Sequence, residues 1–220
     1  MKMIMETSLN TNILEYIVPI RFRSKLLGTG IIHKSLLITA AHVVEELEKE
    51  KIEFSFVYHH QHFAMNWNCK LFYEYDKEKK RIYKDLAIFK TNIISGGLPI
   101  EPENNYDEAK ALLCGYNDEN NDITLNISEG NIRLKPFNDG RTCIAMNKNT
   151  LLLMNVQPLF ICNSGGPLIS ADNNAIGILS AGNIDIHFAR FISSSHILEV
   201  FSKDDCCREA LIEYEKSRFL

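Results

Sequence analysis

The sequence predicts an all-β protein whose strands form a β-sandwich or a β-barrel. Three observations predict this class. Hydrophobic residues recur mostly with a period of two, the apolar segments are short and rich in Ile, Leu, Val, Phe or Tyr, and turn residues such as Gly96-Gly97 separate them. Many short strands with turns between them are typical of these two architectures. The expected strands cover residues 17–22, 27–32, 36–39, 52–57, 70–75, 86–90, 111–116, 123–127, 151–156, 175–180 and 187–192.

Helical segments are few and short. Residues 41–51 predict one helix with a charged, exposed face, and the end of the chain predicts two more segments, over 195–201 and 204–219. Asp204 is a suitable N-cap, because its carboxylate can accept a backbone N–H at the start of a helix over 206–217. A seam over residues 95–105, which contains glycine and proline, divides the strands into an N-terminal and a C-terminal set.

Composition and charge exclude several classes of protein. The chain has 220 residues, of which 45% are hydrophobic and 24% charged, and no apolar run approaches the roughly 20 residues of a membrane helix. A net charge of −4 and the lack of a basic patch argue against nucleic acid as a partner. The first residues carry no secretory signal, so we expect a cytoplasmic protein, with leaderless export left open. The 6 cysteines, none in C-x-x-C spacing, are expected to be reduced thiols.

Three segments carry the residue types that nucleophilic catalysis needs. His42 follows an apolar strand, Asp85 opens another, and Ser164 lies in a glycine-rich turn over residues 162–168. A serine hydroxyl is a weak nucleophile at neutral pH and needs a neighbouring base, and a histidine base needs a carboxylate to orient it. Glycines beside the serine leave room for a substrate backbone, and backbone N–H groups of such a turn can hold an oxyanion. Each segment alone is an ordinary structural feature, but together they predict a hydrolase.

At these residues the sequence resembles the chymotrypsin-fold (trypsin-like) serine peptidases, over about residues 17–201. Residues 38–42 match the family's Leu-Thr-Ala-Ala-His pattern with Ile for Leu, and residues 164–168 match its Ser-Gly-Gly-Pro-Leu pattern. The order His, Asp, Ser along the chain differs from that of subtilisin-type enzymes and of α/β-hydrolases. The segment over 176–182 also looks like the family strand that binds the substrate backbone.

The resemblance implies two antiparallel six-stranded β-barrels with the site in the cleft between them. The first barrel, over residues 1–97, would carry His42 and Asp85, and the second, over residues 98–202, would carry Ser164, with a helical tail over 203–220. It implies a serine endopeptidase in which His42 is the general base, Asp85 orients it and Ser164 is the nucleophile, with no metal or cofactor. Activity should then fall as the pH drops through about 6–7, where histidine becomes charged.

Two departures from the family pattern carry information. Asn163 stands where proteases activated by zymogen cleavage have Asp, and it cannot make their ion pair with a new N-terminus. The bacterial HtrA-type proteases have Asn there, so we expect the chain to be closest to HtrA-type and bacterial trypsin-like peptidase domains, without a PDZ domain. Cys162 stands where the family has Gly. The backbone N–H groups of Cys162 and Ser164 are expected to form the oxyanion hole, although the Cβ of Cys162 restricts the orientation of its peptide.

The resemblance also assigns substrate contacts. Pro158 occupies the position that is Asp in trypsin, which argues against Lys or Arg before the scissile bond and favours a small or medium apolar side chain. The other expected contacts are the pocket residues Leu159 and Ile186 and the backbone of Ser180, Ala181 and Gly182, which would pair with the substrate as an added strand.

Two other functions stay open. The chain could be a catalytically silent binding module of the same fold, or a latent protease that a regulatory protein partner activates in trans through the helix over 204–220. Protein or peptide substrates are the expected partners, with no nucleic acid and no membrane. The histidines over residues 59–62 are expected to lie on a surface strand and not to bind metal.

Overall fold

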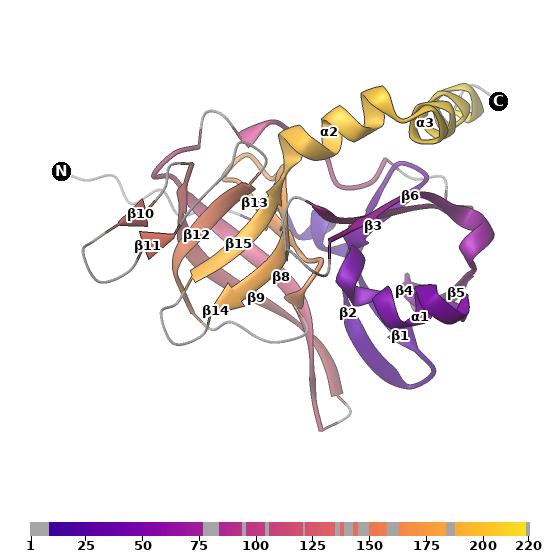
Figure 1. Cartoon of the computed structure of the whole chain (residues 1–220). Helices are drawn as coiled ribbons and strands as arrows, with labels where there is room; N and C mark the ends of the chain where they lie inside the picture. Colours follow the sequence, from indigo (N-terminus) through magenta and orange to yellow (C-terminus); the bar gives the residue numbers. More distant parts are fainter. Residues whose placement is uncertain are drawn as a thin grey trace.

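The computed structural model of the chain describes residues 9–76, 84–93, 96–103, 106–120, 122–134, 137–138, 143–144, 150–157, 163–183 and 188–218. Two β-structures lie side by side, and a pair of helices crosses above both of them (Figure 1). None of the helices in this part of the chain is long and apolar enough to span a membrane.

The N-terminal half forms one curled sheet of seven strands, in the order β5-β4-β1-β2-β3-β7-β6. Every described strand pair in it is antiparallel. The inner strand β3 is buried along its whole length, as expected for an uninterrupted apolar strand paired on both sides. The strands are β1 (Ile17–Phe22), β2 (Lys25–His33), β3 (Leu36–Ala40), β4 (Phe54–Tyr58), β5 (Gln61–Met65), β6 (Lys70–Tyr75) and β7 (Asp85–Lys90).

The C-terminal half forms a closed six-stranded barrel, in the order β12-β15-β14-β13-β8-β9. The hairpin of β8 and β9 extends beyond the barrel wall (Figure 1). A separate two-stranded ribbon joins β10 and β11. The strands are β8 (Lys110–Glu119), β9 (Asp122–Arg133), β10 (Phe137–Asn138), β11 (Cys143–Ile144), β12 (Thr150–Gln157), β13 (Pro167–Ile169), β14 (Ala175–Asn183) and β15 (Phe188–Ser193).

The helices are short except at the end of the chain. Asp204 caps the last helix, because its carboxylate accepts the backbone N–H of Cys207 at 2.9 Å, which confirms the predicted N-cap. The α-helices are α1 (Glu45–Glu50), α2 (Ser194–Lys203) and α3 (Asp205–Ser217), and the 3-10 helices cover Thr11–Tyr16, Ala41–Val43 and Trp67–Cys69.

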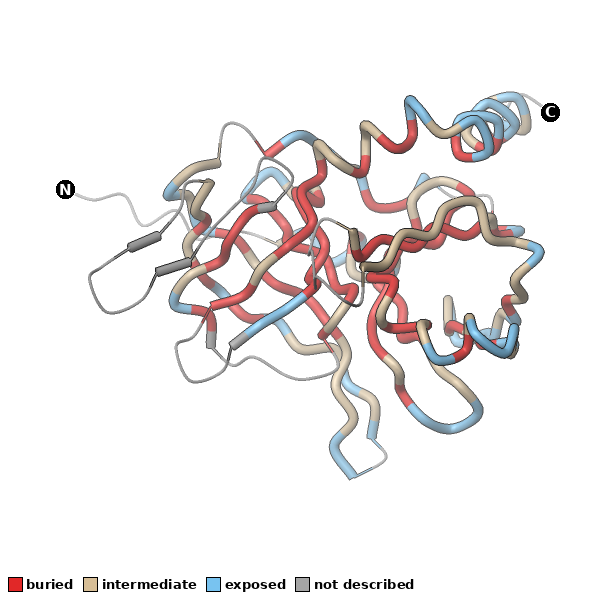
Figure 2. Tube along the Cα trace, viewed as in Figure 1, coloured by how far each residue is buried: buried red, intermediate tan, exposed pale blue. Residues whose placement is uncertain are grey.

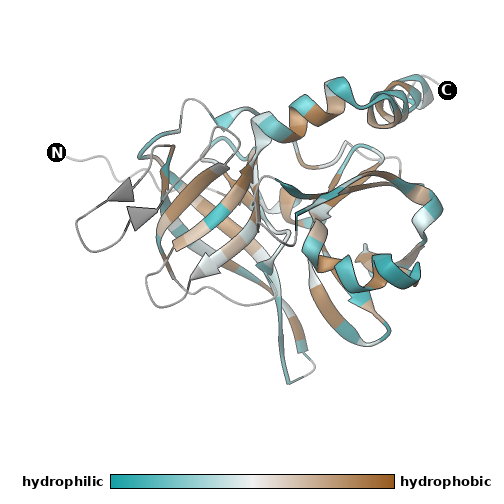
Figure 3. Ribbon diagram, viewed as in Figure 1, coloured by the Kyte–Doolittle hydropathy of each residue, from teal (hydrophilic) through white to brown (hydrophobic). Residues whose placement is uncertain are grey.

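The buried hydrophobic residues form separate cores. Figure 2 shows buried residues in both β-structures and in the helices, and Figure 3 shows the hydrophobic segments of the same elements. One core fills the curled sheet and another fills the closed barrel. The largest core joins the two structures and includes Ile38 of β3, Ile178 of β14 and Phe201 of α2. Because burial of apolar area is the main stabilising contribution, this shared core holds the two halves together and to the helices.

The C-terminal helices also bind the first sheet through polar contacts. The Lys34 ammonium lies 2.6 Å from the Glu215 carboxylate, and Lys90 pairs with Glu213. The His33 ring stacks on Phe201, with the ring centroids 5.7 Å apart. The tail is therefore packed against the sheet that carries His42 and Asp85.

The predicted fold class is confirmed, with one refinement of its first half. The first half was expected to be a six-stranded barrel, and it is a curled sheet of seven strands. Its two end strands, β5 and β6, are joined by the short helix Trp67–Cys69 and do not pair with each other. The surface strand expected over residues 59–62 begins later than predicted, because β5 covers Gln61–Met65. His59 and His60 form the turn before it, both with positive φ, so only His62 of the three lies on a strand.

Candidate active site

The pairing of β3 with β7 brings His42 and Asp85 together. Ala40 pairs with Leu86. His42 follows Ala40 by two residues and Asp85 precedes Leu86 directly, so both lie at the same end of these two antiparallel strands. The backbone N–H of His42 donates to Oδ1 of Asp85 at 2.8 Å, and His42 Nδ1 lies 2.8 Å from Oδ2. An ionised carboxylate only accepts hydrogen bonds, so Nδ1 carries the proton and Nε2 is the ring nitrogen left for another partner.

Burial differs between the two partners. The Asp85 side chain is 6% exposed and the His42 side chain 29%. The carboxylate is thus held inside the protein while the imidazole reaches the surface of a cavity. This is the arrangement in which a carboxylate fixes the orientation and tautomer of a histidine.

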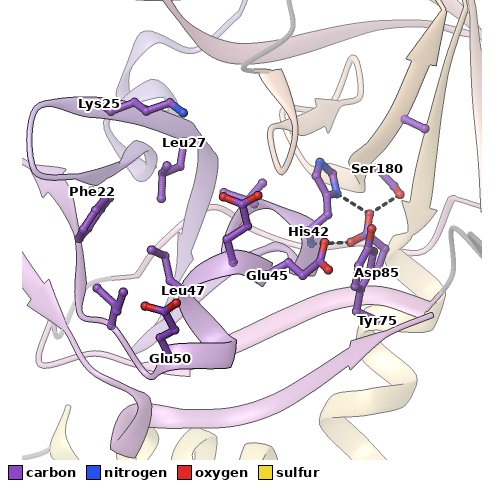
Figure 4. Close-up of a pocket in the computed structure, with 14 residues that line it drawn as sticks. Phe22, Lys25, Leu27, His42, Glu45, Leu47, Glu50, Tyr75, Asp85 and Ser180 are labelled. Atoms are coloured by element: carbon purple, nitrogen blue, oxygen red, sulfur yellow. Dashed lines mark hydrogen bonds and ion pairs between the residues drawn. The ribbon is translucent and has the colours of Figure 1, made fainter. Parts of the chain in front are cut away.

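Ser180 completes the surroundings of Asp85. Its hydroxyl donates to Oδ2 of Asp85 at 2.5 Å, and the side chain is buried (Figure 4). The register of β14 against β15 shifts between Leu179 and Ala181, and such a bulge redirects a side chain. The sequence indicated only a backbone role for Ser180, because a single bulge has no reliable signature in one sequence.

The turn that carries Ser164 packs directly against the first sheet. The Thr29 N–H of β2 donates to the Ser164 carbonyl at 2.8 Å, and the Gly165 N–H donates to the Leu179 carbonyl at 2.8 Å. Gly165 has a φ of +81°, and a Cβ there would lie 2.1 Å from the Thr29 carbonyl oxygen and 2.3 Å from Thr39 Oγ1. Only glycine fits this position, so the conformation of the turn depends on it.

The hydroxyl of Ser164 is not bonded to His42. Both side chains lie in the described part of the chain, and no hydrogen bond joins them. The two segments are nevertheless close to the same strands, because the Ser164 turn is bonded to β2 and His42 directly follows β3. The neighbouring Asn163 is fully buried, and its amide has no partner in the described part of the chain. Cys162, the other expected oxyanion donor, lies outside the described residues.

The expected backbone-binding edge has no neighbouring strand within the described part of the chain. Among the described residues, strand β14 pairs with β13 only up to Ile178, and beyond that point it pairs with β15 alone. Ala181 and Gly182 are exposed on this free edge, which could accept another strand. The expected pocket residues Pro158, Leu159 and Ile186 lie outside the described residues.

A cavity of about 690 Å³ opens beside the His42–Asp85 pair. Ser180 and Ala181 line one end, and Phe22, Lys25 and helix α1 line the other (Figure 4). Its lining mixes apolar side chains with the carboxylates of α1. The cavity therefore offers space for a ligand in direct contact with the histidine.

A thiol beneath the turn is not available as a nucleophile. Cys114 is fully buried, and its carbonyl oxygen would lie 2.2 Å from a Cβ at Gly166. Burial raises the pKa of the Cys114 thiol to about 12, so it stays protonated at neutral pH. Cys69, Cys114, Cys206 and Cys207 are free thiols. Within the described ranges no group of three or more His, Cys, Asp or Glu side chains could hold a metal ion.

Comparisons with known proteins agree with this architecture. The sequence profile of the trypsin-like peptidase domain matches residues 28–178. The fold is similar to that of the inactive form of the Rv3671c protease from M. tuberculosis, with a TM-score of 0.61, 17% identity, and 89% of this chain and 91% of that chain covered. A Glu endopeptidase in complex with MPD gives a TM-score of 0.62 at 15% identity, covering 88% of this chain and 94% of that chain.

A serine endoprotease from Yersinia pestis gives a TM-score of 0.58 at 21% identity, with 88% of this chain and 63% of that chain covered. At these identities the likeness shows the fold alone. No curated protein matches the chain closely enough to count as a relative. The profile match covers more than half of the chain and includes His42, Asp85 and Ser164. The chain therefore belongs to the family of trypsin-like peptidase domains.

Proposed function

We propose that the chain is a serine endopeptidase that hydrolyses peptide bonds of protein substrates through Ser164, His42 and Asp85. The observation that carries the proposal is the two-point contact of His42 with Asp85, through the backbone N–H and through Nδ1. This contact leaves Nε2 to act as a base, on the side of a cavity large enough for a peptide.

The reaction would proceed through an acyl-enzyme. Ser164 Oγ attacks the scissile carbonyl carbon while His42 Nε2 takes the hydroxyl proton, and Asp85 stabilises the resulting imidazolium. His42 then gives that proton to the leaving amine as the C–N bond breaks. A water molecule, deprotonated by His42, attacks the acyl carbon and releases Ser164.

The backbone of the turn supports an oxyanion site at Ser164. The N–H groups of Gly165 and Gly166 are used by the Leu179 and Asn163 carbonyls. The Ser164 N–H has no backbone acceptor among the described residues. Together with the N–H of Cys162 it would hold the oxyanion, and each such donor lowers the barrier by about 3–4 kcal/mol.

A fluorophosphonate probe tests the nucleophile. The wild-type protein, Ser164→Ala and the control Ser202→Ala, which removes an exposed serine of α2, would be treated and digested, and the adduct located by mass spectrometry. We expect an adduct on Ser164 in the wild type and in Ser202→Ala, and hydrolysis of denatured casein by the same two proteins. A folded wild-type protein that gives no adduct and no hydrolysis would refute the proposal.

The missing hydrogen bond between Ser164 and His42 favours a second candidate, a latent peptidase that another protein activates. In that case the isolated chain gives no adduct, and a partner restores labelling of Ser164. Catalytic hydrogen bonds are often loose in unliganded enzymes, so we place this candidate second.

A further inference from the structure

The cavity beside His42 is lined by carboxylates and by apolar side chains. Helix α1 contributes Glu45, Glu46 and Glu50 to its lining, and the hairpin of β1 and β2 contributes one lysine, Lys25. Glu45 is engaged by Lys49, with 3.4 Å between the ammonium and carboxylate groups. Glu46 and Glu50 are exposed, and neither forms an ion pair within the described residues.

Apolar side chains form another part of the lining. Leu47 of α1 is buried, and Leu27 of β2 and Phe22 of β1 are half-buried, and all three line the same space. Figure 4 shows Leu27 and Phe22 on the hairpin side, facing α1 with Glu50 below Leu47. Apolar side chains next to carboxylates suit a ligand side chain with a long hydrocarbon stem and a cationic head, which among amino acids means Lys or Arg.

The position of His42 decides which part of a peptide enters this space. The resemblance implies that the substrate pairs with β14 at Ala181 and Gly182, where β13 no longer pairs with this strand, and we take the paired residues to be those that precede the scissile bond. His42 gives its proton to the amine of the residue that follows the bond. A peptide that runs from β14 past His42 therefore places its leaving part toward α1 and the hairpin of β1 and β2.

We infer that this cavity binds the residues that follow the scissile bond and selects substrates with Lys or Arg there, through Glu46 and Glu50. The inference rests on the proposed function. It concerns the leaving side of the substrate and is separate from the apolar preference expected before the scissile bond.

Cleavage of a peptide library measures the selection directly. A proteome-derived library would be digested with the wild type, with the double variant Glu46→Gln and Glu50→Gln, and with a control that removes two exposed carboxylates outside the cavity, Glu53→Gln and Glu209→Gln. We expect Lys and Arg to be enriched about fivefold within the three positions after the cut, in the wild type and in the control. The enrichment should disappear in the double variant, while the residues before the cut are unchanged.

A binding measurement decides the question without turnover. In the Ser164→Ala background, the fluorescein-labelled peptide Ala-Ala-Arg-Ala-Arg-Ala would be compared by anisotropy with its Gln-for-Arg analogue. We expect about fivefold tighter binding of the Arg peptide at low salt. The preference should be lost in the Glu46→Gln and Glu50→Gln background, and at 1 M salt, where charges are screened beyond about 3 Å.

The outcomes separate this inference from the proposed function. Hydrolysis with no enrichment, or with an enrichment that survives the double variant, overturns the inference and leaves the peptidase proposal standing. No hydrolysis and no labelling of Ser164 overturns the peptidase proposal. In that case, a preference for the Arg peptide that depends on Glu46 and Glu50 still supports a site for basic peptides. If the Arg peptide is not preferred, the inference is overturned together with the peptidase proposal.

Discussion

Replacing Gly165 by alanine tests whether the turn at Ser164 requires a glycine at this position. An alanine at this position would have to adopt a φ of +81°, and its Cβ would lie 2.1 Å from the Thr29 carbonyl oxygen. A left-handed backbone costs an alanine about 1 kcal/mol, and overpacking against a backbone atom adds about 2 kcal/mol. We expect a total loss of about 3 kcal/mol in the free energy of unfolding, or a displaced turn.

Thermal unfolding followed by circular dichroism measures this loss. In a chain of this size, 3 kcal/mol corresponds to a decrease in Tm of about 6–12 °C. The matched control is Gly96→Ala, because a Cβ at Gly96 meets nothing within 4 Å. If Gly165→Ala unfolds at the wild-type temperature and its Ser164 reacts with the fluorophosphonate probe at the wild-type rate, the turn does not require glycine at this position.

Three further predictions concern single side chains. Ser180→Ala should lower kcat/KM about tenfold because Asp85 loses a buried donor, and Ser180→Thr should retain most of the activity, which steady-state kinetics on one peptide would show. Burial lowers the pKa of His33, so the unfolded chain binds more protons at mildly acid pH, and the free energy of unfolding should fall as the pH drops below about 6.5. His33→Phe should flatten that dependence in urea titrations between pH 5 and 7.5, and an equal slope in both proteins would contradict it. Burial raises the pKa of the Cys207 thiol to about 12, whereas Cys206 is exposed. Iodoacetamide at pH 8 should therefore modify Cys206 before Cys207, and peptide mass spectrometry would detect the order.

Much of the fold could be predicted because the apolar strands carry a local signal. The segment before His42 is apolar throughout, and it forms a strand that is buried along its length, as such a run indicates. The resemblance at residues 38–42 and 164–168 also led to the correct fold class, and the pairing of His42 with Asp85 follows from one strand register. These features depend on short segments that the sequence shows directly.

The features that the sequence missed depend on backbone geometry. The strand expected over residues 59–62 begins only at Gln61, because His59 and His60 form a turn with positive φ, and histidine has no strong preference that announces such a turn. The contact of Ser180 with Asp85 depends on a bulge in β14 and on the approach of two halves of the chain. Neither bulges nor contacts over 95 residues have a local signature.

The site is distributed over the two halves, so its geometry depends on how firmly they are joined. Asp85 belongs to the first sheet, yet it accepts the hydroxyl of Ser180 from the barrel, and the Ser164 turn is bonded to Thr29 of the first sheet. Both hydrogen bonds join the first sheet to the barrel, at the interface that contains the shared core. Helices α2 and α3 pack against both halves through the same core. A loosening of this boundary would separate His42 from the Ser164 turn before either β-structure unfolds. Loss of the site at temperatures below the main unfolding transition would be the expected sign of this coupling.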